Sequence, residues 1–353
     1  MKRGIVTVAF SGGKDSTAAV LLLRGQGHDV RALTMRLGLP NEEARLERVE
    51  RLARTLAVPW QAVDLRDGFK ARVMEYFIAA YRRGLTPNPC TQCNRHVKFG
   101  LLLDEMKKNA PDGFFATGHY AAKVLISAPE GSLRGEERWF LREPRDLGKS
   151  QIYFLAMIEP AVLGNVLFPL AGMTVGQVRR KVAGLPLANA RESQDVCFLQ
   201  GEELASFLRR HLPDAFRPGD FLNAVGEKIG RHDGALGYTI GQRRGTRFAS
   251  DRRLYVVGRD IAANTVILGE EKDLVHSSLA VTGPVFWRPL QTGETLTIKI
   301  RYERHGHEAE ITEATAGCIR AIFKKPVRAV TPGQFAVFYD SDVIAAAGEI
   351  AAP

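Results

Sequence analysis

The sequence predicts an α/β fold in which a doubly wound parallel sheet is followed by a small mixed domain and a C-terminal antiparallel β-barrel. Strand-like and helix-like runs alternate from Ile5 to Thr117, which is typical of a parallel sheet covered by helices. From about Gly201, glycine and aromatic residues are spaced through short runs. From about Val275, successive alternating runs are typical of antiparallel strands.

The first part of the chain alternates strand and helix in a regular order. Short apolar runs predict strands, and longer runs with apolar residues at helical spacing predict helices. The predicted strands are Ile5 to Phe10, Val30 to Met35, Trp60 to Asp64 and Phe114 to Thr117, and the predicted helices are Ala18 to Leu23, Glu42 to Leu56, Phe69 to Arg83 and Val97 to Asn109. Ligands of such a sheet bind beyond the carboxyl ends of the strands, where Asp15, Met35 and Gly118 fall.

The segments between and after these elements are less regular. Two prolines and two asparagines between Gly84 and Asn94 predict a loop without regular structure. After an excursion around Pro129 to Glu137, Lys149-Ser150-Gln151 opens another apolar helix. Thr174 to Ala183 predicts a capped helix with basic residues in its last turns, and Arg191 to Cys197 an irregular segment.

The length of 353 residues and these changes of character predict three domains. We place them at residues 1–200, 201–272 and 273–353. The runs that predict barrel strands are Thr295 to Tyr302, Ala309 to Glu313, Cys318 to Phe323 and Gln334 to Tyr339.

The composition predicts a basic protein with a polyanionic partner and no membrane span. Lys and Arg number 49 against 39 acidic residues, a formal net charge of +10. The six apolar residues before the glycine loop are too few for a signal peptide, and Glu159-Pro160 interrupts the apolar stretch from Tyr153 to Leu170. We therefore expect a cytoplasmic location, where the four cysteines serve chemistry or metal binding rather than structural disulfides.

A loop of small residues joins the first strand to the first helix. Ser11-Gly12-Gly13-Lys14-Asp15-Ser16 would let backbone N–H groups converge on an anion at the helix N-terminus, which predicts a phosphate site. The loop is not a Walker A motif, because Gly-x-x-x-x-Gly-Lys-Ser/Thr is absent from the chain. It resembles the SGGxDS loop of the ATP pyrophosphatase, or PP-loop, family, whose sheet has the adenine nucleotide alpha hydrolase-like fold.

Three further stretches resemble the bacterial tRNA-specific 2-thiouridylase family, which replaces the C2 oxygen of the wobble uridine with sulfur. They are Thr86-Pro87-Asn88-Pro89-Cys90-Thr91-Gln92-Cys93-Asn94, Glu192-Ser193-Gln194-Asp195-Val196-Cys197-Phe198 and Thr331-Pro332-Gly333-Gln334-Phe335-Ala336-Val337-Phe338-Tyr339. Gly237 to Gly245 also matches, so the likeness extends from the first strand to the last.

The resemblance implies an ATP site and a carboxylate that orients Mg²⁺ or phosphate. The implied carboxylate is Asp15. The implied ATP contacts are Ala9, Phe10, Ser11, Gly12, Gly13, Lys14, Asp15, Ser16, Met35 and Gly118.

The resemblance also implies a tRNA site. Asn88, Pro89 and Cys90 occupy the stretch that faces the target base, and the positions that contact tRNA are His119, Lys149, Ser150, Gln151, Arg301, Tyr302 and Gln334.

Two cysteines carry the sulfur chemistry that the resemblance implies. A uracil carbonyl is a poor electrophile, so adenylation supplies a leaving group, and a persulfide then delivers sulfur within the site. Cys197 matches the persulfide carrier and Cys93 its partner nucleophile, which implies a persulfide donor or sulfur-relay protein. Arg95, His96 and Lys98 follow Cys93, and positive neighbours can lower the pKa of a thiol. For Cys318 we predict a small buried residue of a barrel strand.

Cys90 departs from the commonest family pattern, which has an aspartate at this position. Cys90, Cys93 and Cys197 could instead ligate a 4Fe–4S cluster, as in other tRNA thiolases, or three corners of a zinc site. We favour the persulfide route because the rest of the chain follows that family. The sequence is also compatible with a PP-loop ligase that adds an amine, with a basic RNA-binding protein and with a zinc-stabilised scaffold. Release of pyrophosphate from ATP in the presence of tRNA would distinguish an enzyme from a scaffold.

Overall fold

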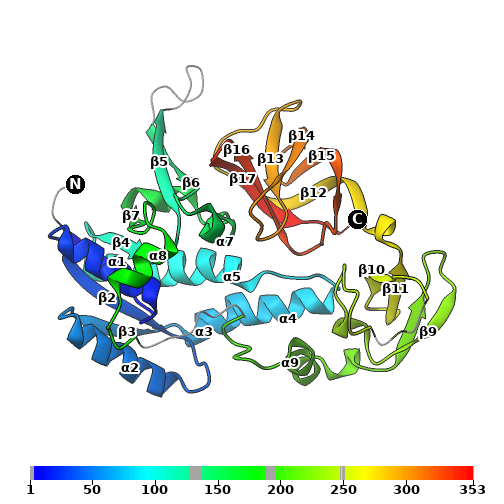
Figure 1. Cartoon of the computed structure of the whole chain (residues 1–353), viewed down its shortest axis with the longest axis horizontal. Coiled ribbons are helices and arrows are strands. Elements are labelled where there is room, and N and C mark those ends of the chain that lie inside the picture. Colours follow the sequence, from blue (N-terminus) through cyan, green and yellow to red (C-terminus); the bar gives the residue numbers. More distant parts are fainter. Residues whose placement is uncertain (1–3, 128–136, 188–195, 247, 249–250, 353) are drawn as a thin grey trace. The chain divides into compact units, whose positions relative to one another are not determined.

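A computed structural model describes residues 4–127, 137–187, 196–246, 248 and 251–352 of the chain (Figure 1). The chain divides into two compact units. The first comprises residues 1–73, 90–194 and 339–346, and the second residues 74–89, 195–338 and 347–353. The domain boundaries expected from the sequence stay a prediction. Within the described helices, no segment is both long and apolar enough to cross a membrane.

The first unit is built on a sheet of five parallel strands in the order β3-β2-β1-β4-β7. These strands are β1 (Ile5–Ala9), β2 (Asp29–Arg36), β3 (Trp60–Asp64), β4 (Phe114–Thr117) and β7 (Val166–Leu167). The first four were predicted from the sequence to within one residue at each end. The fold class predicted for this part of the chain is confirmed.

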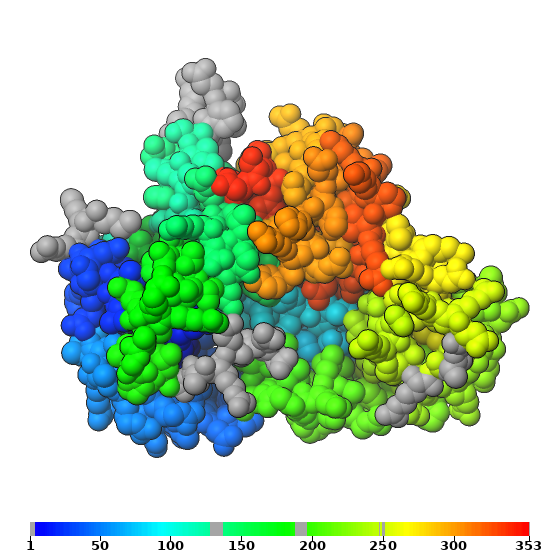
Figure 2. Space-filling view, viewed as in Figure 1, coloured from blue at the N-terminus to red at the C-terminus, as the bar shows by residue number. Residues whose placement is uncertain are grey.

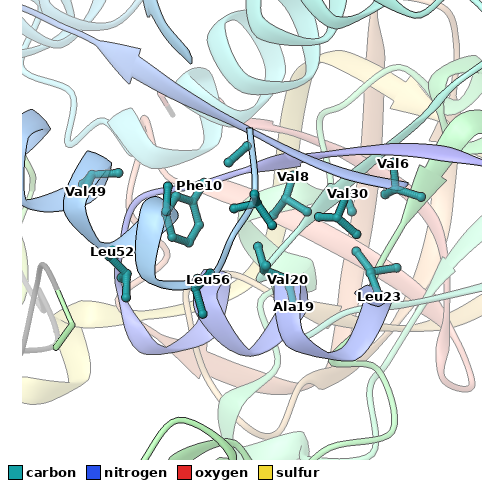
Figure 3. Packing of buried hydrophobic residues seen from close by; sticks show 14 of the residues in the cluster. Val6, Val8, Phe10, Ala19, Val20, Leu23, Val30, Val49, Leu52 and Leu56 are labelled. Carbon is teal, nitrogen blue, oxygen red and sulfur yellow. The ribbon is translucent and has the colours of Figure 1, made fainter. Parts of the chain in front are cut away.

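Helices α1 (Lys14–Gly25) and α2 (Glu42–Thr55) pack their apolar faces on this sheet. Figure 3 shows Val6, Val8 and Phe10 of the β1 region meeting Val20 of α1 and Leu52 of α2. All five side chains are at most 2% exposed, so this packing fixes the start of α1 against the end of β1.

The other helical segments that the structure describes are shorter, and several of them follow one another directly along the chain. They are α3 (Arg66–Phe69), η1 (Lys70–Met74), α4 (Glu75–Arg82), α5 (Pro89–Gln92), η2 (Cys93–Leu102), α6 (Leu103–Asn109), η3 (Leu147–Lys149), α7 (Ile152–Leu155), η4 (Pro160–Asn165), α8 (Val175–Lys181), α9 (Leu204–His211), η5 (Pro213–Ala215), η6 (Ala235–Gly237) and η7 (Glu271–Leu274). The cap predicted at the start of α8 is present and takes the form of a capping box, because Thr174 and Gln177 exchange hydrogen bonds.

Two expectations for these helices were wrong. Gly84 to Asn94 is not irregular throughout, because a helix begins at Pro89 and continues through α5 into η2. Proline is tolerated in a first helical turn, where its missing N–H would have no intrahelical partner. The apolar helix expected after Gln151 is a single turn, α7, since Glu159-Pro160 starts a separate 3₁₀ segment.

The second unit contains a mixed four-stranded sheet in the order β10-β11-β8-β9. Its strands are β8 (Gly219–Leu222), β9 (Lys228–His232), β10 (Tyr255–Asp260) and β11 (Thr265–Gly269). Phe221, Val256 and Val266 form the centre of its core. The small mixed domain predicted after Gly201 is therefore confirmed as a fold.

Six antiparallel strands form the C-terminal barrel, in the order β12-β15-β14-β13-β16-β17, and pairing of β12 with β17 closes it. They are β12 (Val275–Phe286), β13 (Thr295–Lys299), β14 (His307–Ala314), β15 (Cys318–Arg328), β16 (Phe335–Asp340) and β17 (Val343–Ile350). Buried residues such as Ile311 and Phe335 fill its interior, and Figure 2 shows its outer side chains in orange to red. The hairpin of β5 (Ala122–Ser127) and β6 (Glu137–Arg142) pairs with β17 at Val343.

Candidate active site

The strand order of the parallel sheet reverses between β1 and β4, which lie side by side. In open α/β sheets, ligands bind outside the carboxyl ends of the strands at such a switch point. The loop from Phe10 to Gly13 follows β1 there, and Gly118 and His119 follow β4. The sheet topology thus brings together two of the segments that the sequence analysis selected.

Hydrogen bonds fix the shape of the glycine loop. The Phe10 N–H donates to the Leu33 carbonyl at 2.7 Å, and the Ser16 hydroxyl donates to the Gly13 carbonyl at 3.1 Å. Gly12 has a φ of 72°, a left-handed conformation that glycine adopts without strain. Gly13 is the N-cap of α1 and supplies no side-chain cap, so the positive end of the helix dipole faces the mouth of the loop. This arrangement suits an anion.

Gly118 approaches the first turn of α1 closely. A Cβ atom at this position would lie 2.6 Å from the Ser16 nitrogen and 2.7 Å from the Asp15 carbonyl carbon. Both are backbone atoms, so a larger residue would push β4 and the glycine loop apart.

Asp15 is held by a neighbour that the sequence analysis missed. The buried Tyr120 hydroxyl donates to Asp15 Oδ1 at 3.1 Å, and Lys14 Nζ lies 3.8 Å from Oδ2. Burial, and then the negative charge of Asp15, raise the pKa of Tyr120, which remains a donor. The Asp15 side chain is 30% exposed, so a ligand can reach it.

Three cations surround the glycine loop. Burial is the main cause that lowers the pKa of Lys14, and the positive charges of Lys149 and Arg179 lower it further. Arg179 lies on α8, next to Val178, which packs against Ala18 of α1. The basic last turn of α8 was visible in the sequence, but only the packing of α8 on α1 brings Arg179 to the loop.

Met35 lies near the carboxyl end of β2, and several hydrogen bonds hold the segment that follows it. Arg45 donates to the Met35 carbonyl at 3.0 Å and to Glu42 at 3.1 Å. The Glu42 carboxylate also accepts from the N–H groups of Leu37 and Gly38, both at 2.8 Å. The carboxyl end of β2 therefore has a fixed conformation.

Two candidate thiols lie at the start of the helix that begins at Pro89. Cys90 lies in α5 and is exposed, whereas Cys93 opens η2 and is half-buried. Burial raises the pKa of Cys93 to about 11, although the charge of Lys98 lowers it. Although Cys90 is partly exposed, the burial of the rest of its side chain raises its pKa, and the charge of Lys98 lowers it. The positive charge of Lys98 thus lowers the pKa of Cys93, but burial has the larger effect.

Lys98 is the basic neighbour of Cys93 that acts on the thiol, and the helix geometry explains why. In η2 the backbone bonds follow the i to i+5 pattern of a π-helix, which places Lys98 one turn after Cys93. Arg95 instead pairs with Glu159 at 2.7 Å. Burial lowers the pKa of His96 below its ordinary value, so it adds little positive charge at neutral pH.

Lys98 also bonds the buried His119 at the end of β4. Lys98 Nζ lies 3.3 Å from His119 Nε2, and His119 Nδ1 lies 2.9 Å from Thr117 Oγ1. Burial, and then Lys98, hold the pKa of His119 well below its ordinary value, so its ring is neutral. A lysine ammonium only donates, so Nε2 accepts and the ring proton lies on Nδ1, which donates to Thr117. His119 is thus committed to this network through both nitrogens.

Of the remaining candidates of the first unit, Gln151 is hydrogen-bonded to Tyr120. Gln151 Oε1 accepts from the Tyr120 N–H, and the Gln151 N–H donates to the Tyr120 carbonyl, both at 2.9 Å. Ser150 is buried, and Lys149 is half-buried at the end of η3. Gln151 therefore stabilises the backbone at Tyr120, in addition to the tRNA contact that the resemblance implies.

In the second unit, the segment before Asn88 and Pro89 is anchored on two sides. Arg259 of β10 donates to the Leu85 carbonyl at 3.0 Å and to the Thr86 hydroxyl at 3.1 Å. The Gln334 side chain donates to the Thr86 carbonyl at 2.8 Å, and the Thr86 N–H donates to the Pro332 carbonyl at 2.9 Å. Two of the sequence motifs are therefore hydrogen-bonded to each other.

The other candidates of this unit are exposed. Cys197 lies in a turn, and the neighbouring Phe198 packs against Phe77 and Phe207 at ring distances of 5.1 and 5.3 Å. Residues 192–195 of the same motif lie outside the described residues. Arg301 and Tyr302 follow β13, and Arg301 donates to Glu303 at 3.2 Å.

Comparison with known proteins matches nearly the whole chain. The family described as tRNA methyl transferase HUP domain matches residues 4–201, the tRNA methyl transferase PRC-barrel domain residues 205–270 and the Aminomethyltransferase beta-barrel domain residues 276–350. The tRNA-specific 2-thiouridylase MnmA of Desulforudis audaxviator is 38% identical over 348 residues and covers 98% of both chains. That of Roseiflexus sp. is 37% identical over 374 residues, which cover 98% of this chain and 99% of its own. The chain belongs to the tRNA-specific 2-thiouridylase family.

The three candidate cluster ligands of this 2-thiouridylase family member come from both units. Cys90 and Cys93 belong to the first unit and Cys197 to the second. Among the residues that the structure describes, no three His, Cys, Asp or Glu side chains group closely enough to hold a metal ion. Cys318 is half-buried at the start of β15, rather than fully buried as expected.

Proposed function

We propose that this protein is a tRNA 2-thiouridylase that adenylates the C2 oxygen of the wobble uridine and replaces it with sulfur from a cysteine persulfide. The observation that carries the proposal is the family match over 98% of the chain. The switch-point loop and the cysteine thiols are chemically suited to this reaction. We place the enzyme in the reducing cytoplasm, where cysteines serve chemistry rather than structural disulfides.

In the first step, ATP binds with its phosphates on the loop from Ser11 to Ser16. The N-terminal end of α1 and the positive charges of Lys14, Lys149 and Arg179 favour binding of the negatively charged polyphosphate. Asp15 would hold Mg²⁺ together with phosphate oxygens, a ligand set that suits this ion, because its carboxylate is held in place by Tyr120 and remains accessible. When bound, Mg²⁺ would supply positive charge that neutralises the phosphates.

The tRNA substrate supplies the nucleophile of that step, the C2 oxygen, which attacks the α-phosphorus of ATP. The net charge of +10 favours binding of a polyanion. We assign Asn88, Pro89 and Cys90 to the target base, and Arg301 and Tyr302, which are exposed, to the tRNA.

Sulfur then replaces the activated oxygen. The terminal sulfur of a Cys197 persulfide attacks C2, and AMP leaves with the former C2 oxygen. The Cys93 thiolate next attacks Cys197 Sγ, and the bond between Cys197 Sγ and the transferred sulfur breaks. Its electron pair stays on the transferred sulfur, which becomes the thiocarbonyl, and a Cys93–Cys197 disulfide forms. A persulfide donor or relay protein must reload Cys197 after this disulfide is reduced.

The high pKa of Cys93 limits the attack of its thiolate on Cys197 Sγ. Because burial raises the pKa of Cys93 to about 11, only a small fraction of this thiol is ionised at pH 7. Lys98 increases that fraction, because a positive charge favours the thiolate.

The test separates adenylation from sulfur transfer. Purified enzyme, ATP, Mg²⁺, tRNA and a persulfide donor are combined, and pyrophosphate and 2-thiouridine are measured. We expect Cys197→Ser to release pyrophosphate without forming 2-thiouridine, Asp15→Asn to form neither, and the control Cys318→Ser to behave like the wild type. Formation of 2-thiouridine by Cys197→Ser would contradict the proposed sulfur carrier. Absence of both products from the wild type would contradict the function itself.

A further inference from the structure

Cys90 and Cys93 form a thiol pair one turn apart in the helix that starts at Pro89. Side chains at i and i+3 of a helix have Cβ atoms about 5–6 Å apart, and a disulfide requires roughly 3.5–4.5 Å. The N–H groups of a first helical turn have no intrahelical partners, so this turn can adjust with little loss of hydrogen bonding. The two sulfurs are already close enough for Cys90 to raise the pKa of Cys93.

The two thiols differ in exposure and share a cation. Cys90 is exposed and Cys93 half-buried, so a reductant from solution reaches Cys90 first. The charge of Lys98 favours the thiolate form of both cysteines. In a Cys90–Cys93 disulfide, a reductant from solution would therefore attack the exposed Cys90 sulfur and release Cys93, which takes up a proton.

We propose that Cys90 is a resolving thiol that exchanges the Cys93–Cys197 disulfide for a local Cys90–Cys93 disulfide. This inference rests on the persulfide route proposed above. The Cys90 thiolate attacks Cys93 Sγ, the Cys93–Cys197 bond breaks, and Cys197 leaves as a thiolate that takes a proton from water. A dithiol reductant then reduces the Cys90–Cys93 disulfide, becomes oxidised itself and returns both thiols.

The exchange gives the residue at this position a chemistry that an aspartate cannot supply. A carboxylate can assist a proton transfer, but it cannot attack a disulfide and remain bonded to sulfur. Cys90 also attacks from within the same helix, so it competes well with a reductant in solution. After the exchange, Cys197 is free to accept sulfur again while the local disulfide awaits reduction.

The first experiment tests the pair without turnover. Cys197→Ser protein is treated with diamide in the absence of ATP and tRNA, alkylated and mapped by peptide mass spectrometry. We expect a Cys90–Cys93 disulfide in most molecules and an alkylated Cys318. The matched Cys90→Ser/Cys197→Ser variant should keep Cys93 open to alkylation. If Cys90 and Cys93 of the diamide-treated Cys197→Ser protein are both found alkylated, no disulfide has formed between them and the proposal is overturned.

The second experiment follows the disulfide during turnover. Persulfide-loaded wild-type enzyme reacts once with ATP and tRNA without reductant and is then alkylated and mapped. We expect the Cys90–Cys93 disulfide and an alkylated Cys197 in the wild type, but a Cys93–Cys197 disulfide in both Cys90→Ser and Cys90→Ala. A Cys93–Cys197 disulfide retained by wild-type enzyme would overturn the resolving role.

Two controls separate this inference from other outcomes. Absence of 2-thiouridine from the wild-type reaction would overturn the proposed function, and the diamide experiment would still decide whether the thiol pair exists. Stoichiometric iron in anaerobically purified wild-type protein, lost in Cys90→Ser, would overturn the resolving role, because the thiols would then be metal ligands.

Discussion

Lys98 Nζ lies 3.3 Å from Nε2 of the buried, neutral His119. This contact joins η2, which carries the thiol of Cys93, to the end of β4 at the switch point of the sheet. The neutral imidazole accepts a hydrogen bond from the Lys98 ammonium and carries no charge that would repel it or neutralise it. Lys98 therefore keeps a positive charge near two thiols while one of its protons is fixed by His119.

Replacing Lys98 should make Cys93 less reactive. In Lys98→Gln the side chain can still donate to His119 but carries no charge, so the pKa of Cys93 should rise further. We expect alkylation of Cys93 by iodoacetamide at pH 8 to slow roughly tenfold, since a nearby opposite charge typically shifts a pKa by about 1–3. Lys98→Arg should stay within about threefold of the wild type. Peptide mass spectrometry measures the rate of Cys93 alkylation in each protein. Equal alkylation rates in the wild type and Lys98→Gln would contradict this role of Lys98.

His119 should make the folded protein sensitive to mild acid. Its pKa in the folded state lies well below the ordinary value of 6.5, so the unfolded chain binds its proton first as the pH falls. The stabilisation is therefore fully present above about pH 6.5 and is lost as the pH falls below it. We expect the urea midpoint to drop between pH 7.5 and 5, and to drop less in His119→Gln, which cannot titrate. Parallel curves for the two proteins would show that His119 does not contribute.

The sequence was sufficient for the sheet and for the glycine loop, but not for the thiols. β1 to β4 follow from local apolar runs, and their order follows from the general topology of such sheets. The environment of Cys93 depends on burial and on the π-helical turn that selects Lys98 over Arg95, and neither is encoded in sequence spacing. Tyr120 was likewise missed, because its bond to Asp15 connects the segment after β4 to the first turn of α1, which are distant in the sequence.

Gly118→Ala should impair ATP use. The added Cβ would lie 2.6 Å from the Ser16 nitrogen, a contact that only a shift of backbone can relieve. We expect tRNA-dependent pyrophosphate release to fall at least tenfold, because displacing a catalytic loop by about 1 Å can cost 10²-fold. Gly164→Ala is a matched control, since nothing lies within 4 Å of a Cβ there. Normal pyrophosphate release by Gly118→Ala would contradict the close packing of β4 on α1.

Arg259 should stabilise the segment that leads to Asn88 and Pro89. Besides Leu85 and Thr86, its guanidinium donates to the carbonyls of Gly84, at 3.2 Å, and of Tyr238. Arg259→Met keeps the length of the side chain but leaves these acceptors without their donor, which should cost roughly 1–3 kcal/mol of unfolding free energy. Arg259→Lys should fall between Arg259→Met and the wild type, because an ammonium cannot serve four acceptors.

The comparison residue for Arg259 is Arg252, whose side chain is 79% exposed and which pairs with Glu270 at 3.4 Å. Such surface pairs contribute little, so Arg252→Met should change the unfolding free energy by no more than about 0.5 kcal/mol. Thiolation should fall in Arg259→Met even below its unfolding temperature, because Thr86 lies only two residues before Asn88, the first of the proposed base-facing residues. Equal stability and equal 2-thiouridine yield for Arg259→Met and Arg252→Met would mean that the anchoring of Thr86 does not depend on Arg259.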